Sequence, residues 1–338
     1  MKTTNNDILL NVNELEVSFF THAGEVKAVR KVSYDLKYGE AMGIVGESGS
    51  GKSVSSYALM GIIPEPGKVL GGSINFEDKE ITNLSEAEMQ KLRGKDVGMV
   101  FQDPMTSLNP LFTVGNQIDE SLKKHTDLDK KERKKRIIEL FELVGINQPK
   151  KRLKQYPHEF SGGMRQRVMI AMALACNPKL LIADEPTTAL DVTIQAQIIE
   201  LLKELKEKIN MSIIFITHDL GVISEICDKV AVMYAGNIIE RGSIDDIFYN
   251  PKHPYTLGLL KSIPKINADE HERLIPIEGN PVDLINPPKG CAFAPRCKSC
   301  MNICMEKVPP VYSVENEHEA SCWLLLKEEF EREVAQSL

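Results

Sequence analysis

A glycine-rich segment at residues 46–53 constrains the fold of this chain more than any other feature. It reads GESGSGKS and fits the pattern G-x-x-x-x-G-K-[ST]. The apolar run 41–45 precedes it, and the helix-compatible stretch 52–63 follows it. A strand, a glycine loop and a helix in this order wrap backbone N–H groups and a helix N-terminus around a polyphosphate. The sequence therefore predicts a nucleotide-binding core of the α/β class at this loop.

Two side chains of this loop have expected roles of their own. Lys52 can reach the β- and γ-phosphates, and the Ser53 hydroxyl can ligate Mg²⁺. The other loop residues that we expect to contact the nucleotide are Gly46, Ser48, Gly49, Ser50 and Gly51.

An apolar run at residues 180–183 ends in two adjacent carboxylates, Asp184 and Glu185. A buried strand that ends in this way delivers an acid to the mouth of a nucleotide site. We expect Asp184 to hold Mg²⁺, directly or through water, and Glu185 to polarise the water that attacks the γ-phosphate.

The order of apolar segments supports an α/β fold up to about residue 250. Strand-like stretches alternate with turns from residue 8 to about 45, and residues 116–175 are helix-like. Farther on, the apolar runs 179–183 and 211–217 flank the amphipathic segment 194–208. This alternation is typical of a parallel sheet with crossover helices.

The texture of the sequence changes near residue 250, where prolines become frequent. We expect a small, loop-rich C-terminal unit there, with few helices or long strands. Such a unit needs a cross-link, such as a bound metal, to hold one conformation. Five of the seven cysteines lie in this region, with the spacing C-x5-C-x2-C-x3-C followed by 17 residues and a last cysteine. In a reducing compartment such thiols could gather around a [4Fe–4S] cluster or a Zn²⁺ ion, or remain free.

Charge and hydropathy exclude other classes of protein. The chain has 41 Lys+Arg against 48 Asp+Glu, a net charge of −7, which does not favour non-specific binding to nucleic acid. No run of 18 or more apolar residues exists, so no transmembrane helix is expected. The polar first ten residues lack the apolar segment of a secretory signal, so we expect the chain to stay in the cytoplasm.

A further string, FSGGMRQR at residues 160–167, indicates the family. Together with Gln102, Asp191 and His218, it closely resembles the signature of the ATP-binding cassette (ABC) ATPases. The resemblance covers residues 8 to about 250. It implies a P-loop NTPase core with an antiparallel β subdomain and a helical subdomain.

The resemblance to ABC ATPases also assigns roles to single residues. Catalysis by Glu185 is assisted by Gln102, which senses Mg²⁺ and the attacking water, and by His218, which contacts the γ-phosphate. Phe19 aligns with the aromatic residue that stacks on adenine. The residues that reach ATP held by the opposite subunit are Ser161, Gly162, Gly163 and Asp191.

The end of the chain narrows the resemblance to one branch. HPYT at residues 253–256 and the string GCAFAPRC at 290–297 resemble the ATP-binding subunits of dipeptide and oligopeptide importers, the DppD/OppD type. Similar subunits carry a [4Fe–4S] cluster on cysteines that match Cys291, Cys297, Cys304 and Cys322, which leaves Cys300 as an extra cysteine; Zn²⁺ is the alternative. The expected division is a nucleotide-binding domain at 1–250, with its helical subdomain at about 111–175, and a C-terminal extension at 251–338.

These resemblances imply an ATPase that powers the import of di- and oligopeptides. The expected partners are a second ABC ATPase subunit (a paralogue or a second copy), two integral-membrane permease subunits and an extracytoplasmic substrate-binding protein, with no nucleic acid. The expected location is the cytoplasmic face of the cell membrane. Alternatives are an ATPase for a nickel or other small-solute importer, or a soluble ABC ATPase that acts on nucleic acid or ribosomes. A redox-sensing role of the cysteine-rich tail is also open.

Overall fold

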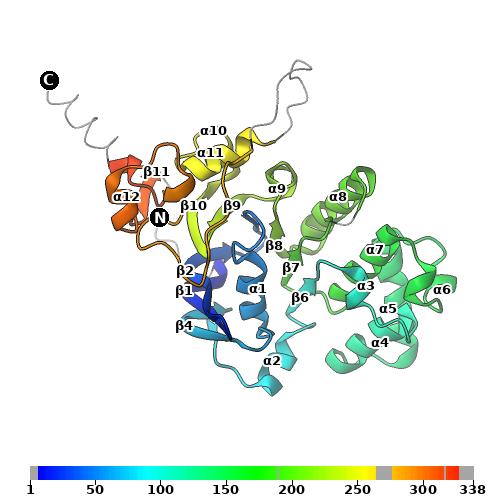
Figure 1. The fold of residues 1–338 in the computed structure, drawn as a ribbon. Helices are drawn as coiled ribbons and strands as arrows, with labels where there is room; N and C mark the ends of the chain where they lie inside the picture. The colour runs from blue at the N-terminus through cyan, green and yellow to red at the C-terminus, as the bar shows by residue number, and fades with distance from the viewer. Residues whose placement is uncertain (1–6, 189, 264–275, 316, 327–338) are drawn as a thin grey trace, which may run out of the picture.

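The computed structural model describes residues 7–188, 190–263, 276–315 and 317–326, which form a mixed α/β protein (Figure 1). The expected α/β class is confirmed, with an antiparallel sheet, a mostly parallel sheet and a separate group of helices.

Within the described residues, the N-terminal strands form a four-stranded antiparallel sheet in the order β2-β1-β4-β5. A tight turn joins β1 (Ile8–Thr21) to β2 (Gly24–Lys37), and β4 (Gly67–Phe76) pairs with the other edge of β1. The short β5 (Lys79–Glu80) completes the sheet.

A second sheet lies at the centre, and it has eight strands in the described part of the chain, in the order β11-β12-β10-β9-β3-β8-β7-β6. Its parallel strands are β3 (Ala41–Val45), β6 (Val97–Val100), β7 (Leu180–Asp184), β8 (Ser212–Thr217) and β9 (Lys229–Tyr234). Every residue of β3, β7 and β8 is buried, because helices and the antiparallel sheet cover both faces.

The side chains of β3 alternate between two hydrophobic clusters, one on each face of the central sheet. Ala41 and Val45 belong to a cluster that includes residues of α8 (Val192–Ile209) and α9 (Leu220–Ile226). Met42 and Ile44 belong to another cluster, which joins α1 (Lys52–Met60) to the antiparallel sheet. Successive residues of a strand point to opposite faces, so β3 takes part in both clusters and its carboxyl end is held rigidly.

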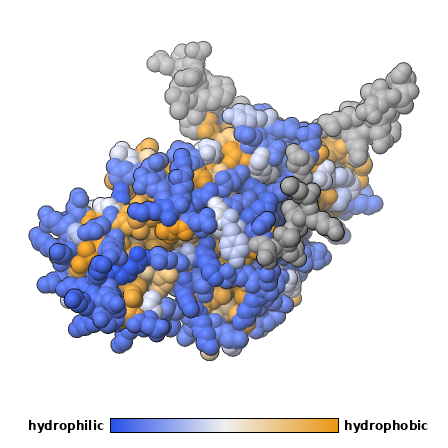
Figure 2. Space-filling view, turned by 180° about the vertical axis from the view of Figure 1, so that it is seen from behind, coloured by the Kyte–Doolittle hydropathy of each residue, from blue (hydrophilic) through white to orange (hydrophobic). Residues whose placement is uncertain are grey.

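The helix-like region of the sequence forms a group of helices beside the central sheet (Figure 1). It contains α4 (Val114–His125), α5 (Lys130–Leu143), α6 (Pro149–Arg152) and α7 (Gly162–Ala173), and α3 (Pro104–Ser107) connects it to β6. Buried residues of α4, α5 and α7 pack into the same cluster as α8. Figure 2 shows a mostly hydrophilic surface with hydrophobic patches, several of which lie on the side that carries these helices.

The C-terminal unit, defined here as residues 251–263, 276–315 and 317–326, has more regular structure than its prolines suggest. It contains α11 (Pro254–Lys261), α12 (Asn302–Glu306), β11 (Tyr312–Glu315) and β12 (His318–Ala320). Pro254 starts α11 at a position where its missing N–H has no helical partner to lose. Strand β12 pairs with β10 (Asn237–Ser243), which makes the unit an edge of the central sheet.

The remaining elements are short, and they are α2 (Glu86–Leu92), η2 (Pro157–Glu159), α10 (Ile244–Tyr249) and η3 (Ala294–Arg296). None of the described helices is both long enough and apolar enough to cross a bilayer.

Candidate functional site

A cavity of about 770 Å³ opens at the carboxyl ends of β3 and β7. We call it the nucleotide cavity. Its lining consists of residues 47–54 of the glycine loop and start of α1, the side chains of Gln102, Glu185 and His218, and four residues of the C-terminal unit, Leu259, Ser262, Pro276 and Ile277.

The glycine loop, residues 46–53, is called the P-loop below, and its backbone requires glycine at two positions. Gly46 has φ of 157°, and a Cβ atom there would lie 2.1 Å from the carbonyl oxygen of Met233. Gly51 has φ of 99°, and a Cβ atom there would lie 2.3 Å from the carbonyl oxygen of Ala28. The loop therefore keeps its shape only because these residues lack side chains.

Lys52 is folded back over the P-loop. Its Nζ donates hydrogen bonds to the carbonyl oxygens of Gly46, at 2.7 Å, and Glu47, at 3.0 Å. Burial lowers the pKa of Lys52, and the nearby carboxylates of Glu185, Asp184 and Glu47 oppose that shift. The ammonium group is thus held where it can reach a phosphate that enters the cavity.

Ser53 and Asp184 meet beside the cavity. The Ser53 hydroxyl donates to Asp184 Oδ1 at 2.8 Å, and Asp184 Oδ2 is buried without a hydrogen-bond partner among the described residues. Burial raises the pKa of Asp184. A hydroxyl, a carboxylate and an orphaned carboxylate oxygen are the hard oxygen donors that Mg²⁺ prefers, so the pair fits this ion.

Glu185 follows β7 in a left-handed backbone conformation, with φ of 45°. Its Oε2 accepts hydrogen bonds from Gln102 Nε2 and from Thr188 Oγ1, both at 2.9 Å. His218 Nδ1 lies 3.5 Å from Glu185 Oε1. Side chains that are far apart in the sequence are therefore gathered around one carboxylate, and Thr188 is a member that our sequence analysis missed.

The signature residues lie outside the lining of the nucleotide cavity. Ser161 accepts the N–H of Met164 as the N-cap of α7, and Asp191 accepts the N–H of Ile194 as the N-cap of α8. Ser161, Gly162 and Asp191 are exposed, and Gly163 is partly buried. Of the described residues that line the nucleotide cavity, none belongs to this signature set.

Phe19 also lies outside the cavity lining. It is partly buried and packs against the core that joins α1 to the antiparallel sheet, while the neighbouring Phe20 is 47% exposed. A Cβ atom at Gly67 would lie 2.6 Å from the Phe19 ring, so this glycine makes room for the aromatic side chain.

The cysteine prediction needs correction. Cys291, Cys297, Cys304 and Cys322 line a common space, but its volume is about 10 Å³, roughly that of one water molecule. Burial raises the pKa of Cys291 and Cys297, and it raises the pKa of Cys322 to about 12. Among the described residues, no group of three or more His, Cys, Asp or Glu side chains is placed to hold a metal ion.

The prediction of a [4Fe–4S] cluster on these cysteines is therefore wrong, and the zinc alternative has no support. The four cysteines share the lining of this small space with seven other residues. Sequence spacing shows that cysteines can meet, but the size of the space between them depends on the packing of the whole unit.

Two residues of the C-terminal unit reach the P-loop, which our sequence analysis did not anticipate. The N–H of Glu47 donates to Tyr255 Oη at 2.9 Å, and the guanidinium of Arg296 donates to both carboxylate oxygens of Glu47. Tyr255 belongs to the HPYT string, and Arg296 to the GCAFAPRC string, but neither string shows by itself which loop its residues contact.

Comparisons with known proteins agree with this geometry. Residues 29–188 match the family model described as ABC transporter, and residues 239–304 match the one described as oligopeptide/dipeptide transporter, C-terminal region.

Individual relatives extend the match over almost the whole chain. The oligopeptide transport ATP-binding protein OppD of Bacillus subtilis is 60% identical over 94% of this chain and 89% of its own. The dipeptide transport ATP-binding protein DppD of the same organism is 54% identical over 94% of each chain. Both names describe ATP-binding proteins of peptide transport.

A solved structure gives the same fold. It is described as a dimeric post-hydrolysis state of an ATP-binding cassette bound to ADP and Pi, and it is 27% identical. The match has a TM-score of 0.63 and covers 70% of this chain and 98% of that one.

Proposed function

The chain belongs to the family of ATP-binding subunits of oligopeptide and dipeptide ABC transporters, and from this premise we propose how its site drives transport. It is an ATPase whose activity powers peptide import. The observation that carries the proposal is the nucleotide cavity, where Lys52, Gln102, Glu185 and His218 lie around one space beside Ser53 and Asp184.

The P-loop binds the phosphates of ATP. Residues 47–54, which include most of the loop and the start of α1, line the cavity, and the Lys52 ammonium can exchange its bonds to the loop carbonyls for bonds to phosphate oxygens. Ser53, Asp184 and Gln102 would hold Mg²⁺, which supplies positive charge to the phosphate oxygens when it is bound.

Glu185 orients the water that attacks the γ-phosphate. Gln102 and Thr188 donate to one of its oxygens, which leaves the other oxygen, on the side of His218, available to the water. His218 is placed to contact the γ-phosphate. Phe19 remains our proposed adenine contact.

We propose that a second cassette completes the site. Ser161, Gly162, Gly163 and Asp191 line no part of this chain's own cavity, and most of them are exposed. Because these residues lie outside the chain's own cavity, they are placed to contact a second cassette. This supports a head-to-tail pair in which the signature of each cassette reaches the ATP bound by the P-loop of its partner. The second cassette is a paralogue or another copy of this chain.

The helical part supports contact with membrane subunits. Three apolar side chains near its junction with β6 are exposed, namely Met105 at 61%, Leu111 at 79% and Phe112 at 53%. Since Gln102 immediately precedes this region, closure at the cavity can be passed to two permease subunits docked here. The chain would then lie at the cytoplasmic face of the membrane, supplied with peptide by an extracytoplasmic binding protein.

We also propose the division into a nucleotide-binding domain at 1–250, with a helical subdomain at about 111–175, and a C-terminal extension at 251–338. The start of α11 soon after residue 250 supports this boundary.

Peptide uptake by the complete importer in membrane vesicles tests the proposal. Glu185→Gln is expected to stop ATP-dependent uptake while the subunit still binds ATP, because only the orienting carboxylate is lost. The matched control is Glu200→Gln, an exposed position on α8. Uptake by the Glu185→Gln importer at the wild-type rate would contradict the proposal.

A further inference from the structure

The C-terminal unit forms part of the wall of the nucleotide cavity. Leu259 and Ser262, from α11 and its end, and Pro276 and Ile277 line the same space as the P-loop. The unit that directly follows the nucleotide-binding domain in the sequence therefore lines part of the cavity where we propose that nucleotide binds.

The strongest connection between the C-terminal unit and the P-loop is an ion pair between Arg296 and Glu47. Arg296 Nη1 donates to Glu47 Oε2 at 2.6 Å, and Nη2 donates to Glu47 Oε1 at 3.0 Å. The Arg296 side chain is only 4% exposed. Two parallel bonds between a guanidinium and a carboxylate fix the orientation of both groups, which a single surface ion pair does not.

The Arg296 guanidinium also donates hydrogen bonds to two backbone carbonyl oxygens. Its Nε donates to the carbonyl oxygen of Glu278 at 3.0 Å, and Nη2 donates to that of Ile277 at 3.1 Å. Its Cζ lies 5.8 Å from the centre of the Tyr234 ring. Since Ile277 lines the cavity, Arg296 joins the P-loop to another part of the cavity wall.

The backbone of Glu47 is held by the same unit. Its N–H donates to Tyr255 Oη at 2.9 Å. The Tyr255 ring packs against Tyr234 and Phe293, with centroid distances of 4.7 and 5.4 Å. Both the side chain and the peptide of Glu47 are thus fixed by groups that are themselves buried in an aromatic cluster.

Glu47 is the second residue of the P-loop, and its carbonyl oxygen accepts a hydrogen bond from Lys52 Nζ. A displacement of Glu47 therefore moves a contact of the lysine that reaches the phosphates. Removal of Arg296 would leave a partly buried carboxylate without its partner, which is costly enough to make the loop rearrange.

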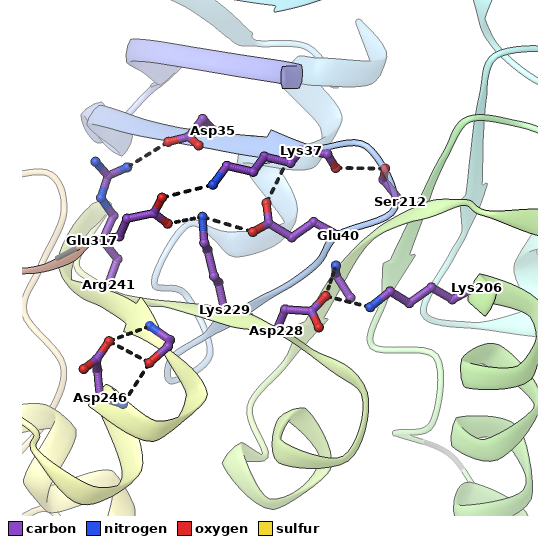
Figure 3. A network of polar contacts seen from close by, with 12 residues as sticks. Asp35, Lys37, Glu40, Lys206, Ser212, Asp228, Lys229, Arg241, Asp246 and Glu317 are labelled. Atoms are coloured by element: carbon purple, nitrogen blue, oxygen red, sulfur yellow. Dashed lines mark hydrogen bonds and ion pairs between the residues drawn. The ribbon is translucent and has the colours of Figure 1, made fainter. Parts of the chain in front are cut away.

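The C-terminal unit is anchored at its other end as well. Glu317 bonds to Lys37 at 3.0 Å and to Lys229, which also bonds to Glu40 at 3.0 Å (Figure 3). Arg241 of β10 bonds to Glu319 of β12 at 2.8 Å. These contacts, together with the pairing of β12 with β10, connect the unit to the central sheet and, through Lys37, to the antiparallel sheet.

We propose that Arg296 is a positioning residue that holds the P-loop, through Glu47, in the conformation that binds nucleotide. The C-terminal unit thereby sets the affinity of the site for ATP. This inference rests on the proposed function, because the site that the unit adjusts is the ATP site described above.

The test uses the full-length chain, with MgATP as the probe, and the complete importer for steady-state hydrolysis. Arg296→Ala is expected to raise the dissociation constant and the KM for ATP by roughly tenfold and to change kcat by less than about twofold, since binding and not chemistry is affected. Arg296→Lys is expected to bind ATP more tightly than Arg296→Ala but less tightly than the wild type. It keeps the positive charge but cannot make two parallel hydrogen bonds to the carboxylate. The matched control is Lys298→Ala, which removes an exposed ion pair with Glu278 in the same unit.

A double-mutant cycle then tests whether Glu47 transmits the effect. Arg296→Ala and Glu47→Gln together are expected to weaken ATP binding no more than the more damaging single change does. Strictly additive losses would overturn the proposal. So would an Arg296→Ala protein with a lower melting temperature but unchanged ATP affinity, because that outcome shows a role in stability alone. Failure of the wild-type chain to bind ATP would instead count against the proposed function.

Discussion

Gln102 donates a hydrogen bond from Nε2 to Glu185 Oε2 over 2.9 Å, although 83 positions separate the two residues. Gln102 follows β6, and Glu185 follows β7, its neighbour in the central sheet. Parallel strands bring their carboxyl ends to the same edge, so this contact joins the residue expected to orient water to the start of the helical part. In the proposed mechanism, this hydrogen bond links the residue that orients the water to the start of the helical part.

The first prediction concerns Lys52. Lys52→Ala is expected to weaken MgATP binding by about 10- to 100-fold, because charged contacts to the phosphates are lost. Fluorescent nucleotide titration measures this, with Lys203→Ala on the exposed face of α8 as control. An unchanged affinity in Lys52→Ala would show that the P-loop does not bind ATP as described.

The second prediction concerns the magnesium ligands. Ser53→Ala is expected to raise the Mg²⁺ concentration needed for half-maximal ATPase activity by roughly tenfold, since one oxygen donor is removed and the Asp184 carboxylate loses its partner. The control is Ser224→Ala, which removes an exposed hydroxyl that donates to the carbonyl oxygen of Gly221. A Mg²⁺ titration that coincides with that of the wild type would rule out Ser53 as a ligand.

The third prediction separates the signature from the P-loop. Ser161→Arg is expected to abolish most ATPase activity of the complete importer while ATP affinity at this chain's own P-loop stays within about twofold, because we propose that Ser161 acts on nucleotide held by the partner cassette. Parallel binding and hydrolysis assays provide the comparison. Loss of ATP binding by the isolated Ser161→Arg chain would mean that the signature serves its own site.

The fourth prediction concerns pH and the anchor in Figure 3. Hydrogen bonds from Lys229 and then Lys37 lower the pKa of Glu317 to about 2. A carboxylate whose folded pKa is depressed stabilises the fold above its unfolded pKa, and this contribution is lost as the pH falls through the folded value.

Glu317→Gln is therefore expected to be less stable than the wild type near neutral pH. The difference should shrink between about pH 5 and pH 2 and should stay below about 1 kcal/mol, because the side chain is largely exposed. Urea unfolding at several pH values measures it, with Glu315→Gln on β11 as control. A stability difference that did not vary with pH would contradict this account.

The residues that we propose as phosphate contacts could be identified from the sequence because they belong to a short local pattern. Gly46 and Gly51 adopt positive φ and meet the backbone carbonyls of Met233 and Ala28, so only glycine fits at these positions. The glycine pattern was visible in the sequence, although the carbonyls belong to other parts of the chain. A strand buried on both faces needs a continuous apolar run, so β7 and its terminal carboxylates were visible as well. The α/β core and its nucleotide site were thus determined by short segments of sequence.

The tertiary structure alone decided how the C-terminal unit is used. The pairing of β12 with β10, the narrow space between the cysteines and the bond from Arg296 to Glu47 all join segments that are distant in sequence. The spacing of the cysteines led us to predict a [4Fe–4S] cluster. Four of them do line one space, but that space is too small for a cluster. Such contacts depend on the relative placement of whole elements, and no local pattern of residues records the distance between two side chains that are 249 positions apart.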